Sequence, residues 1–185
     1  MGEQHKKHSR REHLNDFHLN VAGEYVYGGA LYACQNDDAK QRRIKRAVWG
    51  MAAILIVAVI AGGCIPAPGM QNCFYVLLPY LGEFLGAASV IWALAKLGMD
   101  WGTVREYNYK KSVAVLPVRT AVTAVFSGLG IVCELIFFFV NDHAGQTFFA
   151  LLYVLLKLIA LLSVLVLRAE IMQAEWDKLP KKNNF

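Results

Sequence analysis

The stretch CFYVLLPYLGEFLGAASVIWALAKL, from Cys73 to Leu97, decides the fold of this chain. An α-helix needs ~20 mostly apolar residues to cross ~30 Å of hydrocarbon, and this stretch meets that length with one carboxylate, Glu83, near its middle. Pro79 lies four residues before Glu83 and predicts a kink. Gly82 and Gly86 have the G-x-x-x-G spacing of membrane helices that pack closely. The stretch therefore predicts a membrane-spanning helix packed against other helices.

Three further apolar segments accompany this one, at about 47–64, 113–140 and 147–172. The whole chain of 185 residues is 56% hydrophobic and only 18% charged, whereas a soluble domain has roughly 25% charged residues. Nearly all charge lies between the apolar segments. We therefore predict an all-α integral membrane protein with one four-transmembrane-helix bundle over 47–172, a cytoplasmic segment at 1–46 and a cytoplasmic tail at 173–185.

Positive charge alternates along the chain, and this alternation predicts the orientation of the bundle. The segment before the first helix has nine Lys and Arg residues, the connection between the second and third helices with its flanks has five, and the C-terminal flank has four. The other two connections have none. By the positive-inside rule both termini are cytoplasmic, and we expect a plasma membrane location. The net charge of +5 is explained by this topology without a nucleic-acid partner.

The N-terminal segment is predicted to have two parts. Residues up to about 20 are polar and rich in His, without hydrophobic periodicity or metal-ligand spacing, so a flexible tail is expected there. Residues from about 24 to 46 are expected to form an ordered interfacial segment. In it, Gly28 and Gly29 lie between tyrosine-rich stretches, which favours either a short hairpin or a tyrosine anchor at the headgroups, ahead of a partner-docking element. The basic run 40–46 is expected to attract anionic lipid.

The connection at 65–72 contains two prolines and a glycine and predicts a tight loop. Cys64 and Cys73 bracket it. A disulfide between them would link the first two helices if the loop faces an oxidising compartment, and two free thiols are the alternative. No C-x-x-C pair is present, so a redox role is not indicated.

Three ionisable residues fall inside the apolar segments: Glu83 in the second, Glu134 in the third and Lys157 in the fourth. An isolated charge at such depth costs ~3 kcal/mol or more, so these residues are expected to meet. We predict a buried Glu83–Lys157 pair with Glu134 close by and with Tyr80 and Tyr153 as hydrogen-bond donors. Two interpretations stay open: the pair orients the helices, or the carboxylates form a site for a proton, a cation or a polar solute.

Small and polar residues also form a stripe along the third apolar segment, at spacings of four, three and four. A helical period places this stripe on one face, which must contact protein or water rather than lipid. Its members are Thr123, Ser127, Gly130 and Glu134.

A weak internal repeat relates the second and fourth apolar segments. A shift of 74 residues aligns Phe74 with Phe148, Ser89 with Ser163, and Glu83 with Lys157. If it is genuine, the bundle consists of two tandem helical hairpins, and the charge reversal pairs the halves across a pseudo-twofold axis.

The sequence contains no nucleotide-binding loop, zinc helix motif or nucleophile elbow, so neither a cofactor, a metal nor a catalytic residue is predicted. Two hypotheses for the function lead, with a membrane enzyme third. The first is a non-enzymatic accessory or scaffold subunit of a membrane assembly, with a membrane-protein partner or a homo-oligomer. The second is a small transporter or channel that uses its intramembrane carboxylates.

Overall fold

A computed structural model describes residues 17–19, 23, 25–27, 29–98, 101–141 and 147–179. The predicted flexible tail lies mostly outside these ranges, as does the end of the C-terminal tail.

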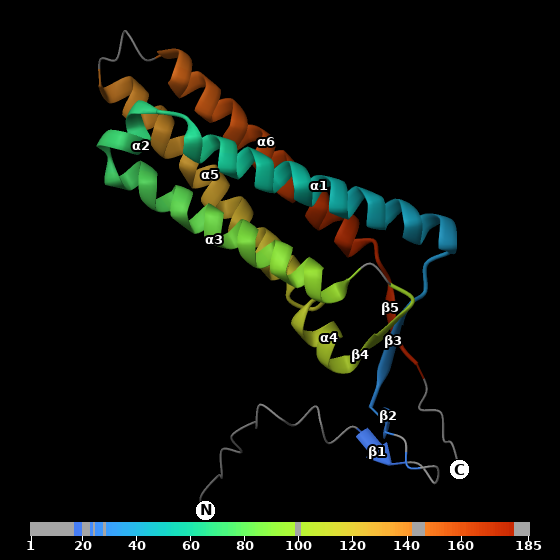
Figure 1. Cartoon of the computed structure of the whole chain (residues 1–185). Coiled ribbons are helices and arrows are strands. Elements are labelled where there is room, and N and C mark those ends of the chain that lie inside the picture. The colour runs from blue at the N-terminus through green and yellow to red at the C-terminus, as the bar shows by residue number, and fades with distance from the viewer. Residues whose placement is uncertain are drawn as a thin grey trace, which may run out of the picture.

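Four long helices form the body of the molecule and confirm the predicted four-helix membrane fold (Figure 1). All are long and apolar enough to cross a bilayer. Large apolar side chains remain exposed along their outer faces, as expected where lipid covers a bundle. The helices are α1 (Asp38–Cys64), α3 (Phe74–Leu97), α5 (Leu116–Val140) and α6 (Thr147–Met172).

The α1 helix begins earlier than the apolar segment that predicted it. Its first turns contain the basic run 40–46, because Lys, Arg and Gln are good helix formers and nothing in this run breaks a helix. In α3, Pro79 is inside the helix, as its sequence position required. That helix ends at Gly98, whose φ of 73° suits glycine and stops the helix.

Helix packing follows the order α3, α5, α6, α1. The α1 helix packs mainly on α6, and α3 packs mainly on α5, with α5 and α6 in contact between them. Direct contact between α1 and α3 is smaller. The predicted hairpins are α1–α3 and α5–α6. The α1–α6 and α3–α5 contacts therefore join one hairpin to the other, and the helices of the second hairpin pack on each other more closely than those of the first.

One end of the bundle is covered by a short helix, α2 (Pro68–Asn72), in place of the simple tight loop predicted there. Pro68 is at the first helical position, where its missing N–H costs nothing. The Asn72 side chain donates to the Pro68 carbonyl at 2.9 Å. Because Pro68 and Gly69 are buried and α2 contacts α3, α5 and α6, this connection is part of the packed bundle.

A three-stranded antiparallel sheet lies at the other end, in the order β4 (Thr103–Arg105), β3 (Leu31–Cys34) and β5 (Trp176–Lys178) (Figure 1). It joins the N-terminal segment, the α3–α5 connection and the C-terminal tail. The sequence favoured either a local hairpin across Gly28 and Gly29 or a tyrosine anchor at the headgroups, and Gly28 lies outside the described residues. The structure pairs β2 (Tyr25–Tyr27) with β1 (Phe17–Leu19), and β3 with strands far along the chain.

Aromatic side chains pack between this sheet and the helices. Trp101 and Trp176 lie with ring centroids 6.1 Å apart, and Tyr32 stacks on Tyr109 of α4 (Glu106–Lys111) at 4.1 Å. Trp101 and Val104 belong to the same apolar core as residues of α1, α3 and α6. The sheet and the bundle therefore share one core.

Candidate functional site

Glu83 lies at the centre of a buried polar cluster. Its carboxylate accepts a hydrogen bond from the Ser127 hydroxyl and forms an ion pair with the Lys157 ammonium. The exposed fractions of Glu83, Ser127 and Lys157 are 0%, 0% and 2%. One carboxylate thus links α3, α5 and α6, and the structure brings together the two charges that the sequence predicted to pair.

Two tyrosine rings surround the Lys157 ammonium. Its Nζ lies 4.6 Å from the ring centroid of Tyr80 and 5.1 Å from that of Tyr153, within the range of cation–π attraction. The sequence led us to expect their hydroxyls as donors to the pair. Instead, the Tyr80 hydroxyl donates to the Val59 carbonyl of α1 at 3.4 Å, and the Tyr153 hydroxyl is buried without a partner. Both tyrosines therefore contact Lys157 through their rings, and neither hydroxyl donates to the pair.

Glycine makes room for this arrangement. A Cβ added to Gly63 of α1 would overlap the Tyr80 hydroxyl, so only glycine fits beside that ring in its observed position. A Cβ at Gly130 would lie 3.6 Å from Lys157 Cε, which is ordinary contact. A side chain is therefore excluded more strictly at Gly63, beside Tyr80, than at Gly130, beside Lys157.

Glu134 is the other carboxylate of the predicted cluster, and it differs from Glu83 in having no donor. It is fully buried on α5, two turns beyond Ser127, or ~10 Å along the helix. Neither carboxylate oxygen has a hydrogen-bond partner, although the Gly69 backbone of α2 lies beside it outside good hydrogen-bond geometry. A Cβ at Gly69 would overlap the Glu134 carboxylate. The short helix α2 thus covers this carboxylate directly.

The predicted polar stripe of α5 is buried in the bundle. Thr123, Ser127 and Glu134 are all fully buried, and the Thr123 hydroxyl donates to the Arg119 carbonyl at 2.8 Å. The sequence identified Ser127 as a member of the stripe but did not link it to Glu83, 44 positions away. Ser127 lies on the same helical face as Glu134, and this position predicted that its side chain faces the interior of the bundle.

Two arginines tie the helices together nearer the sheet. Arg119 of α5 donates to the Ser89 carbonyl of α3 at 2.6 Å, and Arg168 of α6 donates to the Pro117 carbonyl of α5. The Arg119 guanidinium thus satisfies a backbone carbonyl of the neighbouring helix.

All four cysteines carry free thiols. Cys64 is exposed and Cys73 is half-buried, and the two are not bonded to each other in the structure. The disulfide between them stays a prediction for an oxidising compartment. Within the ranges that the structure describes, no three His, Cys, Asp or Glu residues are grouped to hold a metal ion.

The chemistry available to the cluster follows from its charges. Glu83 and Lys157 compensate each other, and Ser127 satisfies a further acceptor site of Glu83. Glu134 is left as a buried group that can take up or release a proton, with the unpaired Tyr153 hydroxyl as another buried polar group. Comparison of the chain with family models, curated proteins and solved structures found no match.

Proposed function

We propose that this small integral membrane protein is a non-enzymatic accessory or scaffold subunit of a membrane assembly. In this proposal it lies in a plasma membrane with both termini in the cytoplasm, as the distribution of Lys and Arg favours. The observation that carries the proposal is the closed Glu83–Lys157 pair. Both of its charges are satisfied inside the protein and hold three helices together.

The ends of the bundle support the same interpretation. At one end α2 packs across α3, α5 and α6. At the other, a sheet made from three separate segments shares a core with the helices. A bundle fixed at both ends is suited to presenting constant surfaces to a partner rather than to large rearrangement.

The subunit hypothesis is tested by purifying the tagged full chain from its native membranes with a gentle detergent. We expect a second membrane protein at a fixed molar ratio that survives a further affinity step and chemical cross-linking. Recovery of only a monomer or homo-oligomer would contradict the proposal. A variant with the tag at the other terminus controls for tag-dependent association.

The unpaired carboxylate of Glu134 favours a second candidate function, a small transporter or channel that binds a proton or cation. A buried carboxyl group without donors inside a membrane bundle is the usual starting point for such a site. Lys157 is already paired with Glu83, so Glu134 has no counter-charge of its own. The unpaired Tyr153 hydroxyl provides another buried polar group near the cluster.

Replacing Glu134 by Gln is expected to abolish a carboxyl C=O band that changes with pH in difference infrared spectra. The substitution keeps the size of the side chain and removes the titratable group, so the helical circular dichroism spectrum should not change. Glu170→Gln is the control, because Glu170 has one buried oxygen without a hydrogen-bond partner, whereas its other oxygen pairs with Arg43 at 3.6 Å. Proton or cation flux into proteoliposomes that is lost with Glu134→Gln alone would favour transport over the scaffold function.

A further inference from the structure

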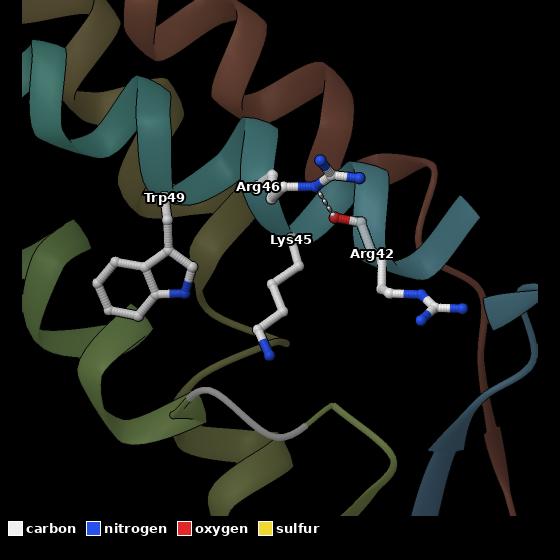
Figure 2. A pocket seen from close by; sticks show the side chains of 4 residues that line it. All are labelled: Arg42, Lys45, Arg46 and Trp49. Carbon is white, nitrogen blue, oxygen red and sulfur yellow. Dashed lines mark hydrogen bonds between the residues drawn. The ribbon is translucent and has the colours of Figure 1, made fainter. Parts of the chain in front are cut away.

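Four side chains of α1 line a hollow of about 280 Å³ at the sheet end of the bundle: Arg42, Lys45, Arg46 and Trp49 (Figure 2). Their spacing of three, one and three places them on one face of the helix. A volume of ~10–15 Å³ on the same measure holds one water molecule, so the hollow has room for more than a single ion. Its size fits a compact polar group.

Among the residues that the structure describes, no carboxylate forms an ion pair with the three cations of the hollow. In the described part of the chain, the ion pairs involve Arg43, Lys110 and Lys157, none of which lines the hollow. Arg42 and Arg46 use one N–H each on backbone carbonyls of α1, at 3.2 and 3.4 Å. Their remaining donors and the Lys45 ammonium are left for an anion.

Trp49 supplies an independent observation. Its indole N–H is buried and has no acceptor, while the ring packs on the core shared by α1 and α3. Figure 2 shows the nitrogen-bearing edge of the indole turned toward the Lys45 side chain. A buried donor without an acceptor is unfavourable, and a bound anion would accept its hydrogen bond.

We propose that this hollow binds the phosphate headgroup of an anionic phospholipid. The two arginines and Lys45 contact the phosphate, and Trp49 marks the depth at which the headgroup meets the acyl chains. The position on α1 favours lipid over soluble phosphate, because the apolar part of this helix begins at Ala47, between Arg46 and Trp49. Indole rings and Arg or Lys side chains together are typical of that boundary.

The test compares phosphatidylglycerol with phosphatidylcholine carrying the same acyl chains, by native mass spectrometry of the full chain in detergent. The wild type is expected to bind phosphatidylglycerol preferentially. The double variant Arg42→Gln/Lys45→Gln is expected to lose this preference by about tenfold or more, because each cation near an anionic lipid contributes roughly fivefold. Trp49→Phe, which keeps a packed ring and removes the N–H, should weaken phosphatidylglycerol binding several-fold.

Lys40→Gln/Arg43→Gln is the charge-matched control, since neither residue lines the hollow: Lys40 lies on the opposite side of the same helix, and Arg43 pairs with Glu170. Equal loss in both double variants would show a diffuse charge effect and overturn the proposal, as would a wild type without preference. Competition with inorganic phosphate tests whether the hollow binds soluble anions instead. If millimolar phosphate displaces phosphatidylglycerol completely, the hollow is a site for soluble anions and the lipid assignment is wrong. Circular dichroism spectra confirm that each variant is folded.

Discussion

Replacing Glu83 by Gln is expected to lower the free energy of unfolding by ~3–5 kcal/mol. The Lys157 ammonium would remain buried among α3, α5 and α6 without its paired carboxylate, with two aromatic rings beside it and the Glu134 carboxylate farther away. Lys157→Met should lower the free energy of unfolding by a similar amount, because it leaves the buried Glu83 carboxylate with the Ser127 hydroxyl as its remaining partner. Both effects are measured as the loss of folded protein along a denaturant or temperature series in detergent.

The double variant Glu83→Gln/Lys157→Met should recover most of this loss. Exchanging a whole buried ion pair for neutral groups of similar size is often neutral in stability, whereas removing one partner is not. The Gln side chain can still accept the Ser127 hydroxyl hydrogen. Additive losses in the double variant would contradict the structural role of the pair. Lys178→Gln, at an exposed residue of β5, is the control for a change of charge alone.

The fold was predictable because its main determinants are local. Each apolar segment is long enough by itself to indicate a membrane-spanning helix. In a bilayer, a single apolar stretch such as Cys73–Leu97 can satisfy its backbone hydrogen bonds only as a helix. The Glu83–Lys157 pair was predictable for a related reason. Charges are so costly in hydrocarbon that two opposite ones at matched depth are expected to meet, whatever the details of packing.

Features that depend on contacts between distant segments were not predictable. The sheet pairs Leu31 with Arg105 and Tyr32 with Lys178, and the strands involved are too short to carry a pattern of their own. The cover of Gly69 over Glu134 likewise depends on how α2 folds back. The hydropathy of the sequence predicts that Glu134 is shielded from lipid, but it does not predict which backbone segment covers it.

Hydropathy also did not predict where α1 begins. The apolar segment marks where the membrane begins, and the helix continues outward through the basic run because helix propensity does not depend on the bilayer. This continuation decides where the charges lie. It places Arg42, Lys45 and Arg46 on one helical face beside Trp49, an arrangement that an unstructured basic run would not produce.

Replacing Gly86 by Leu is expected to separate α3 from α5 and to destabilise the bundle by ~1–3 kcal/mol or more. A Cβ at Gly86 would lie 2.6 Å from Thr123 Oγ1 and 3.3 Å from Thr123 Cα, so rotating a side chain does not relieve the overlap. Because Gly86 is one turn from Glu83, the separation should also weaken the Ser127 hydrogen bond. Thermal unfolding of the purified protein in detergent measures the loss.

Gly128→Leu is the matched control, because a Cβ at Gly128 meets no atom within 4 Å. Both substitutions add the same apolar surface and the same helix propensity to a membrane helix, so these contributions cancel in the comparison. Equal unfolding temperatures for the two variants would show that the approach of α3 to α5 at Thr123 is not required. A loss confined to Gly86→Leu would instead establish that the buried pair depends on this glycine for the distance between its helices.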